Sequence, residues 1–422
     1  MSADSHRMFV LVINTGSSSF KYRLYDMPAG AVVVTGTIES IGRPDARLTQ
    51  TCGGKRQQHN VRAEDHDQAM VAIFDALAQS TPYAAKISAV GHRVVHGTDK
   101  FTGSVILNDE VIASLEQYAD LAPLHNPINL IGIRAAKRHL PNAIQVGCFD
   151  TAFHTSMPRA ACTYPLPWDI CLKYGIRRYG FHGTSHRYVA ERAARLLGKE
   201  LHAVNLITCH LGGGCSITAI KQGRSIDTSM GFTSLEGLVM GTRSGDFDPA
   251  IIFYLNSKGY DLSAISAMCN KQSGLLGISG ISNDMRTLAD LAAQGNTRAQ
   301  LAIEIFCYRI KKYIGAYTAA LDTVDALVFT GGIGENAVDV RRRACTGLTR
   351  IGIEIDDAQN TAAVGVECRI STDASRIAVF VIPTDEEAVI ARDTFLLAHG
   401  PRADEVAHIA ISRRSESINS PA

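Results

Sequence analysis

One strand–turn–strand pattern occurs twice in this chain, and it constrains the fold more than any other feature. Residues 9–25 combine an apolar strand, a short turn of glycine and serine, and a second strand in which apolar and polar residues alternate. The pattern returns at residues 205–220, and superimposing the hairpins places Asn14 on His210 and Gly16 on Gly212. A period of about 200 residues predicts two related domains, because the repeats of a solenoid are far shorter.

The segments between and after the hairpins predict a mixed α/β fold. Apolar residues between positions 70 and 77 recur with helical spacing, and residues 127–139 predict a second helix with proline in its first turn. Residues 89–95 predict a strand. A further strand begins at 326 and leads directly into a glycine-rich loop, after which we expect a helix at about 338–349.

These elements suggest where the domains begin and end. We place the first domain at residues 1–153 and the second at 154–385. The last strand, 377–382, feeds a helix at 386–400, which we expect to return to the first domain. The tail at 401–422 is polar and is predicted to be disordered.

The charge balance and the cysteines narrow the class of protein. Lys and Arg number 42 and Asp and Glu 41 among 422 residues, so the formal net charge is +1. A broad nucleic-acid surface or a polybasic membrane anchor needs an excess of one sign, and we exclude both. The N-terminal apolar run, residues 8–13, is too short to predict a signal peptide, and no apolar run approaches the ~18 residues of a membrane helix. Its ten cysteines include no C-x-x-C pair, which argues against a zinc ribbon and for reduced thiols in a cytoplasmic protein.

The glycine-rich hairpin tips suit the binding of phosphate. Without a Cβ atom in the way, backbone N–H groups can approach phosphate oxygens closely, and Lys21 lies just beyond the first tip. Each tip could also be a simple hairpin turn. A third glycine-rich segment, at residues 331–334, favours the phosphate interpretation over three unrelated turns.

Eight motifs make the chain similar to a known family. They are NTGSSSFK at 14–21, GHRVVHG at 91–97, LAPLHNP at 121–127, FDTAFH at 149–154, YGFHGTSH at 179–186, DTSMG at 227–231, MGTRSGD at 240–246 and FTGGIGEN at 329–336. On these motifs the sequence resembles the acetate and propionate kinase family. The resemblance implies the fold of the sugar kinase, Hsp70 and actin superfamily, an α/β fold with two duplicated RNase H-like domains around an ATP cleft.

The same resemblance implies a reaction and its participants. The expected activity is reversible, Mg²⁺-dependent transfer of the ATP γ-phosphoryl group to acetate, giving acetyl phosphate and ADP by direct in-line transfer. Mn²⁺ is expected to substitute for Mg²⁺, and the family usually forms homodimers. Two alternatives stay open. One is a propionate kinase, and the other is a non-catalytic nucleotide-binding regulatory member of the superfamily.

Repulsion between two anions is the main obstacle to such a transfer. A carboxylate oxygen is already anionic, so no strong base is needed, and cations must lower the barrier. Arg93 and Arg243 lie in glycine-flanked polar segments, and a guanidinium can grip carboxylate and phosphate oxygens together. A solvated salt bridge is the alternative role for either arginine. The resemblance assigns the two arginines to acetate and to the transferring phosphoryl group.

One carboxylate and three histidines are further candidates. Asp150 follows the apolar strand 144–149, a usual position for a functional carboxylate, although a turn or a helix cap would place it there as well. The resemblance makes Asp150 an essential orienting group and assigns His182 to transition-state stabilisation. His125 and His210 receive positioning roles. Each histidine has a structural alternative.

Acetate, metal and nucleotide each have predicted ligands. The predicted acetate-binding residues are Arg93, Val95, His125 and Phe181. The resemblance assigns the metal to Asn14 and Glu386, although a helix capped by Thr384, with acidic residues in its first turn, would explain the segment around Glu386 equally well. The predicted nucleotide-binding residues are Lys21, His210, Leu211, Gly212, Gly213, Gly214, Asp284, Met285, Arg286, Gly332, Ile333, Gly334, Glu335 and Asn336.

The chain departs from the family pattern at three positions. Gly213 stands where the family has an asparagine expected to donate to phosphate, a hydrogen bond of about 1.5–3 kcal/mol. Asp385 replaces an asparagine near the predicted metal and adds a negative charge, and Thr98 replaces a glycine. Val95, two residues beyond Arg93, predicts a narrow acyl pocket that disfavours the extra methylene of propionate by about 1–3 kcal/mol.

Overall fold

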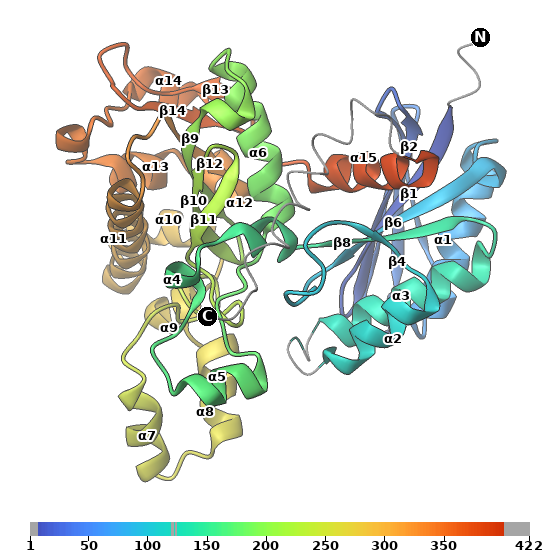
Figure 1. The fold of residues 1–422 in the computed structure, drawn as a ribbon, viewed down its shortest axis with the longest axis horizontal. Helices are drawn as coiled ribbons and strands as arrows, with labels where there is room; N and C mark the ends of the chain where they lie inside the picture. The colour runs from blue at the N-terminus through green and yellow to red at the C-terminus, as the bar shows by residue number, and fades with distance from the viewer. Residues whose placement is uncertain (1–6, 120–121, 123–124, 401–422) are drawn as a thin grey trace, which may run out of the picture. The chain divides into compact units, whose positions relative to one another are not determined.

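Figure 1 shows the fold in a computed structural model that describes residues 7–119, 122 and 125–400. The tail predicted to be disordered, at 401–422, lies outside the described residues. Within the described ranges, no helix combines the length and the apolar character needed to cross a membrane. The chain divides into two compact units, and each has its own β-sheet.

The first unit contains the described residues up to Phe153 and those from Asp385 onward. Its eight-stranded sheet has the order β5-β4-β3-β2-β1-β6-β8-β7, with β6 and β8 parallel to β1 and the other neighbours antiparallel. The strands are β1 Met8–Thr15, β2 Ser19–Met27, β3 Ala31–Glu39, β4 Arg47–Cys52, β5 Lys55–Asn60, β6 Ile87–Val94, β7 Val105–Ile106 and β8 Ile144–Phe149. The helices are α1 His66–Ser80, α2 Asp109–Gln117, α3 Asn126–His139, α15 Glu386–His399 and the 3₁₀ turn η2 Ala84–Lys86.

Helices cover both faces of this sheet. Side chains alternate along a strand, so Val10 and Val12 pack with α15 on one face, while Leu11 and Ile13 pack with α1 and α3 on the other. In Figure 1 the red helix α15 lies along one side of the sheet. A Cβ atom on Gly91 of β6 would stand 2.4 Å from Thr394 Oγ1 on α15, so only glycine allows the helix to pack this closely.

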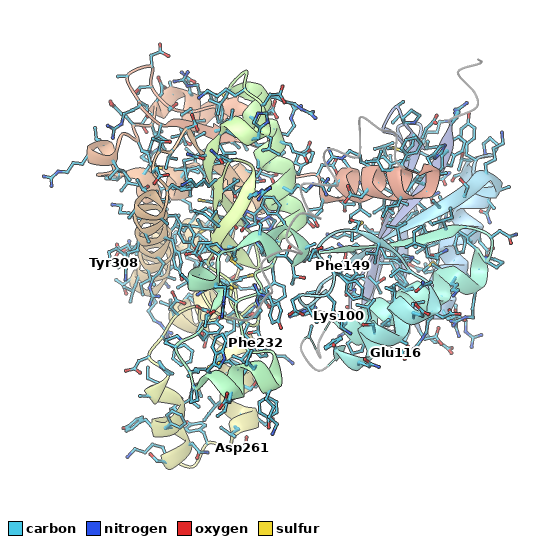
Figure 2. All side chains as sticks on the ribbon, in the orientation of Figure 1. Lys100, Glu116, Phe149, Phe232, Asp261 and Tyr308 are labelled. Atoms are coloured by element: carbon cyan, nitrogen blue, oxygen red, sulfur yellow. The ribbon has the colours of Figure 1, made fainter. Side chains whose placement is uncertain are left out.

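An aromatic pair explains a second glycine of the GHRVVHG motif. Phe149 at the end of β8, labelled in Figure 2, stacks on Phe101 with ring centroids 4.8 Å apart. A Cβ atom on Gly97 would lie 2.8 Å from the Phe149 ring. The segment that follows β6 therefore has glycine where it crosses this ring.

The second unit, His154–Thr384, has a six-stranded sheet in the order β11-β10-β9-β12-β14-β13. Its strands are β9 Asn205–Leu211, β10 Cys215–Lys221, β11 Arg224–Thr228, β12 Ala326–Thr330, β13 Cys368–Arg369 and β14 Ala378–Val381. Its longer helices are α6 Gly183–Leu196, α7 Ala250–Ser257, α8 Leu262–Lys271, α10 Met285–Ala293, α11 Thr297–Ala320 and α13 Val338–Cys345. The shorter elements are α4 Arg159–Cys162, α5 Trp168–Tyr174, α9 Gly274–Ser279, α12 Gly331–Asn336, α14 Asp357–Ala362, η5 Leu201–Ala203 and η6 Thr349–Ile351, with η4 Ala152–Ser156 at the boundary.

The two sheets repeat one topology. In the first unit β3, β2 and β1 form an antiparallel meander, and β6 and β8 follow in parallel; β11, β10, β9, β12 and β14 repeat that order in the second. Asn14 pairs with Lys21 and His210 with Ser216, each one position before the last pair of its hairpin. The predicted α/β fold of two duplicated domains is confirmed.

Three local predictions need correction. The glycine-rich segment after β12 is a short helix, α12, because the Glu335 carboxylate accepts a hydrogen bond from Gly331 N at its first turn (2.8 Å). The following helix, α13, ends at Cys345 rather than near residue 349. Asp385, not Thr384, caps α15, because its side chain accepts a hydrogen bond from Ala388 N at 3.1 Å.

His154 is buried in the second unit and is held as a neutral ring. Its Nε2 donates to the Phe181 carbonyl at 2.9 Å, so its Nδ1 accepts from the Ser225 hydroxyl, also at 2.9 Å. Burial lowers the pKa of His154 to about 4, although the hydrogen bond to Phe181 opposes the shift. Because the pKa is depressed in the folded state, this histidine stabilises the fold fully above pH ~6.5 and loses that contribution as pH falls toward 4.

We expect the substitution His154→Asn to flatten the pH dependence of stability. Between pH 4 and 6.5 the unfolded chain binds one more proton at this position than the folded chain, so wild-type stability rises with pH by up to about 1.4 kcal/mol per pH unit from this group. Urea unfolding at several pH values measures the slope, and His202→Asn, at a surface histidine, is the control. Equal slopes for wild type and His154→Asn would contradict the assignment.

Candidate active site

Arg93 and Asp150 form a two-pronged ion pair in the first unit. Arg93 lies on β6 and Asp150 directly follows β8, the parallel neighbour of β6, so the carboxyl ends of the strands bring the two side chains together. Arg93 Nε donates to Asp150 Oδ1 at 3.0 Å, and Nη2 donates to Oδ2 at 2.6 Å. The Asp150 side chain is 1% exposed and that of Arg93 22%. The pair uses the edge of the guanidinium formed by Nε and Nη2, and on the other edge Nη1 faces Asn14 Oδ1.

Glu386, the first residue of α15, lies beside this pair. Its Oε2 is 3.8 Å from Arg93 Nε, and Asn14 Oδ1 is 3.5 Å from Arg93 Nη1. Burial raises the pKa of Glu386 to about 7, with Arg93 opposing and Asp150 adding to the shift. A carboxylate in this environment gains stability from any additional cation.

The unusual Asp385 has its own cationic partner. Arg23 Nη1, from β2, donates to Asp385 Oδ1 at 2.8 Å, and the same oxygen caps α15. The side chains of Arg23 and Asp385 are about one third exposed, 30% and 31%. The negative charge that the sequence adds at this position is therefore balanced locally.

The predicted metal ligands present the oxygen atoms that Mg²⁺ prefers. Asn14 offers an amide oxygen and Glu386 a carboxylate, and Arg93 already places a cationic group near both. In the part of the chain that the structure describes, no group of three His, Cys, Asp or Glu side chains could hold a metal ion. A donor set this small fits an ion that keeps several waters and binds nucleotide phosphates.

Three histidines and two serines form a network in the second unit. His182 precedes α6 with a left-handed backbone (φ 56°), and its Nδ1 lies 2.9 Å from the Ser216 hydroxyl. The rings of His182 and His210 stack with centroids 4.2 Å apart. His210 Nδ1 is 2.8 Å from Ser185 Oγ, and Ser216 also contacts His186 Nε2 at 2.8 Å. These contacts fix the orientation of both predicted histidines.

The Arg243 side chain lies beside His182 at the tip of the second hairpin. A Cβ atom on Gly214 would lie 3.2 Å from Arg243 Nη2 and 3.3 Å from His182 Nε2, so guanidinium, imidazole and hairpin tip are in contact range. Arg243 Nη1 donates to the Ser234 carbonyl at 2.7 Å. Burial lowers the pKa of Arg243, and over the described residues no carboxylate forms an ion pair with it. A half-buried cation of this kind is suited to an anionic ligand.

Three glycine-containing segments converge on the second hairpin tip. A Cβ atom on Gly212 would lie 4.0 Å from Gly332 N at the start of α12, and Gly241 N donates to the Gly213 carbonyl at 3.1 Å. Gly331 has φ 75° and stands against the Leu211 backbone, a position only glycine tolerates. The tip, the start of α12 and the Arg243 segment thus surround one region.

The other predicted nucleotide residues differ in what they can offer. The side chains of Leu211 and Met285 are buried in the core, so only their main chains could contact a ligand. Glu335 Oε1 accepts from Gly331 N and, at 3.1 Å, from Thr384 N, so it serves as a cap of α12. Arg286 lies on the surface and binds Asp284 through two nitrogens, at 3.1 and 2.6 Å.

The remaining predicted residues lie at element ends. Val95 follows β6, and its N–H donates to Asn129 Oδ1 at 3.1 Å. His125 is exposed at the start of α3, and Lys21 is exposed on β2 opposite Asn14. Phe181 is buried directly before His182.

Sequence reasoning missed Ser216, Ser185 and Arg23. Ser216 stands opposite His210 in the hairpin register, and the repeat could have identified it because Lys21 holds the same place in the first hairpin. Ser185 lies in the first turn of α6. Arg23 carries no signal in the sequence, because its partner Asp385 is 362 residues away.

Solved structures and curated relatives similar to this chain identify its class of enzyme. The structure resembles the crystal structures of an acetate kinase from Porphyromonas gingivalis (TM-score 0.88, 47% identity, 92% of this chain and 99% of that chain) and a propionate kinase from Francisella tularensis (TM-score 0.87, 42% identity, 92% and 99%). An acetate kinase from Pseudothermotoga lettingae is 50% identical over 392 residues, 92% of this chain and 96% of the relative. The chain is a phosphotransferase that acts on a carboxyl group.

The family follows from the match of its model. The chain belongs to the Acetokinase family, whose model matches residues 9–392. ATP and ADP are the nucleotide substrates of this family. The resemblance predicted from the eight motifs and the predicted enzyme class are confirmed.

Gly213 gives a direct test of the phosphate assignment. It is exposed at the tip, and a Cβ atom there would meet no atom within 4 Å, so an asparagine fits without displacing anything. We expect Gly213→Asn to raise kcat/KM for ATP about tenfold or more, because the added amide can donate to phosphate. Gly213→Ala, which adds only the Cβ atom, is the matched control. Equal values for the two variants would contradict a phosphate site at this tip.

Proposed function

We propose that this protein catalyses the reversible transfer of the γ-phosphoryl group of ATP to acetate. The observation that carries the proposal is the convergence of Arg243, His182 and the glycine tip, where a half-buried cation faces backbone that can cradle phosphate. Family membership supports a nucleotide and a carboxylate as the two substrates. The products of the forward reaction are acetyl phosphate and ADP.

The chemistry needs charge stabilisation more than proton transfer. A lone pair of the acetate oxygen forms the new bond to the γ-phosphorus while the bond to the β,γ-bridging oxygen breaks and its electrons remain on ADP. No proton moves, because the nucleophile is already a carboxylate. We assign Arg243 to the charge on the transferring group and Arg93 to the acetate carboxylate, which two guanidinium nitrogens can bind together.

Asp150 and His182 have distinct roles in this proposal. Asp150 binds the Nε edge of Arg93 and so directs the remaining Nη1 edge to the ligand. His182 has Nδ1 engaged with Ser216, and its Nε2 lies beside the Gly214 tip. We assign that Nε2–H as a donor to an equatorial phosphoryl oxygen. His125, Val95 and Phe181 are proposed for the acetate side.

A divalent cation completes the proposed site. Asn14 and Glu386 would hold Mg²⁺, or Mn²⁺ in its place, through water or directly, and the ion would supply neutralisation of the nucleotide phosphates. The raised pKa of Glu386, caused by burial, fits a carboxylate that becomes fully ionised when a cation binds beside it.

Acyl phosphate formation tests the proposed reaction. Purified protein with ATP, Mg²⁺ and acetate in hydroxylamine should give acetyl hydroxamate, and Arg243→Ala should lower kcat at least a thousandfold, because removal of a charged group from the transition state costs about 4 kcal/mol or more. ATP binding to both proteins, measured by calorimetry, controls for folding. Bound ATP without hydroxamate in the wild type would favour the non-catalytic regulatory alternative.

Propionate is the alternative acceptor, and the propionate kinase relative keeps it open. Val95 follows Arg93 by two residues, so we expect acetate to be preferred and Val95→Ala to raise kcat/KM for propionate relative to acetate about tenfold. Val95→Ile is the control and should shift the ratio toward acetate. A wild-type propionate kcat/KM equal to that of acetate would refute a narrow acyl pocket.

A homodimer is proposed from exposed apolar side chains of the second unit. Figure 1 shows α5, α7 and α8 grouped at one end of that unit, and Figure 2 labels Asp261, the residue that caps α8. Phe253 is 75% exposed, Leu262 67% and Leu172 62%, and exposed apolar side chains grouped at one place mark interaction sites. A sedimentation-velocity experiment that gives the monomer mass would exclude the dimer.

A cytoplasmic location stays a prediction from the sequence.

A further inference from the structure

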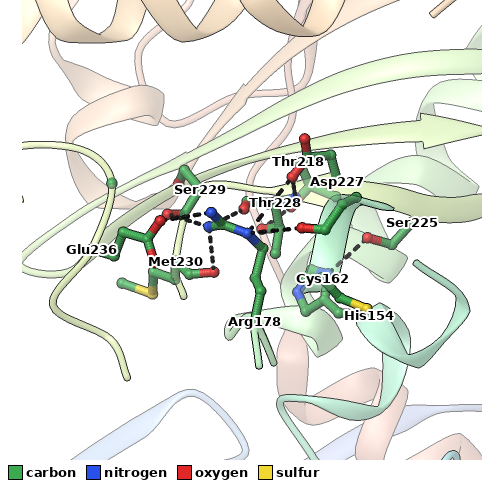
Figure 3. Close-up of polar contacts among 12 residues, drawn as sticks. His154, Cys162, Arg178, Thr218, Ser225, Asp227, Thr228, Ser229, Met230 and Glu236 are labelled. Carbon is green, nitrogen blue, oxygen red and sulfur yellow. Dashed lines mark hydrogen bonds and ion pairs between the residues drawn. The ribbon is translucent and has the colours of Figure 1, made fainter. Parts of the chain in front are cut away.

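The DTSMG motif at 227–231 contributes no group to the proposed reaction, yet an arginine binds its backbone. Arg178 Nη1 donates to the carbonyls of Thr228, Ser229 and Met230 at 2.9, 3.2 and 3.3 Å, as Figure 3 shows. Arg178 Nη2 donates to Glu236 Oε1 at 2.6 Å. The side chains of Arg178 and Glu236 are 16% and 32% exposed. A partly buried guanidinium held by this many acceptors has one orientation.

The segment after Arg178 leads to His182, the proposed hydrogen-bond donor to the transferring phosphoryl group. Tyr179 N and Gly180 N both donate to the Gly231 carbonyl, at 3.1 and 3.3 Å. Gly180 has φ 75°, and a Cβ atom there would lie 2.4 Å from Thr228 Cγ2. Two residues later the backbone turns left-handed at His182, a conformation that needs support from its surroundings. The DTSMG segment therefore provides the surface that fixes the backbone before His182.

The segment after Glu236 leads to the proposed phosphoryl-binding arginine. Gly237 N donates to Asp246 Oδ1 at 2.7 Å and Asp246 N to the Gly237 carbonyl at 2.9 Å, which closes a loop that contains Arg243. Gly237 is positioned against Ser229, because a Cβ atom on it would lie 2.5 Å from the Ser229 carbonyl oxygen. The base of the Arg243 loop thus rests on the same DTSMG segment.

Tyr164 links Glu236 to the backbone that follows the DTSMG segment. Glu236 Oε2 accepts a hydrogen bond from the Tyr164 hydroxyl, and that hydroxyl in turn accepts from Phe232 N at 2.9 Å. A Cβ atom on Gly231 would overlap Glu236 Oε2 and the Tyr164 hydroxyl. The Glu236 and Tyr164 side chains therefore pack directly on the last glycine of the motif.

We propose that Arg178 and Glu236 are positioning residues for phosphoryl transfer, which set His182 and Arg243 in register at the Gly214 tip. Arg178 precedes the His182 segment, Glu236 precedes the Arg243 loop, and their ion pair ties both to one stretch of backbone. The inference rests on the proposed roles of His182 and Arg243. A lysine at position 178 cannot reproduce the tie made by Arg178, because an ammonium lacks the planar guanidinium that reaches three carbonyls and a carboxylate at once.

The test separates kcat from binding. For Arg178→Lys we expect kcat to fall about a hundredfold, the usual effect of moving a catalytic group by about 1 Å, while KM for acetate and the dissociation constant of ATP change less than threefold. Glu236→Gln should lower kcat less, and the double variant should be no slower than Arg178→Lys, because both substitutions break the same tie. The hydroxamate assay gives kcat and KM, and calorimetry gives ATP binding.

A surface pair in the same unit is the matched control. Arg192 binds Glu367 through Nε and Nη2, at 3.0 and 2.7 Å, with side chains 34% and 30% exposed. Arg192→Lys should leave kcat within twofold of wild type. If Arg178→Lys does not fold, Tyr164→Phe removes only the hydroxyl that orients Glu236, and it should lower kcat with unchanged ATP binding.

Two results would overturn the inference. One is a kcat for Arg178→Lys, or for Tyr164→Phe in its place, within twofold of wild type. The other is a parallel loss of kcat, ATP affinity and thermal midpoint, which a general structural role would produce. Failure of the proposed function is a separate result, because it would appear in the wild type as bound ATP without hydroxamate.

Discussion

The ion pair between Arg93 and Asp150 organises the first unit. Asp150 is 1% exposed, and a carboxylate this deeply buried is tolerated only when a partner satisfies both of its oxygens. The pair joins the carboxyl ends of β6 and β8 and brings Glu386, at the start of α15, within 3.8 Å of the guanidinium. This arrangement requires α15 to pack closely on β6, and the absence of a Cβ atom at Gly91 makes the close packing possible.

Much of the fold was predictable because the apolar residues recur with helical or strand spacing and one hairpin pattern occurs twice. The repeated hairpins predicted the duplicated sheets, and Asn14 and His210 do occupy equivalent register positions. The missed features are of two kinds: contacts between distant residues, which no local pattern contains, and a side chain that bonds the first turn of its own helix. Arg23 balances Asp385 across 362 residues, and the glycine-rich segment after β12 is helical because the Glu335 side chain folds back onto its first N–H group. The candidate site residues were predicted from the family motifs, and the neighbours that orient them were not.

The two units share one sheet topology but carry different polar side chains at equivalent positions of their hairpins. The position before the last pair of the first hairpin holds Asn14 opposite Lys21, an amide oxygen and an ammonium. The same position in the second hairpin holds His210 opposite Ser216, which orient an imidazole network instead. A sheet fixes the direction and spacing of its side chains regardless of their identity, so substitutions at one register position change the ligand without changing the fold.

The two site arginines are held in opposite ways, and this difference suits two different ligands. Arg93 is paired with Asp150 and lies near Glu386, so the negative groups around it at least match its charge, and it can bind a carboxylate mainly through geometry. Arg243 is held by a backbone carbonyl, and the described residues pair it with no carboxylate, so its charge remains available to an anion. A transferring phosphoryl group spreads charge over three oxygens and needs that unmatched charge more than acetate does. The assignment of Arg93 to acetate and Arg243 to phosphate therefore has an electrostatic basis in the structure of each unit alone.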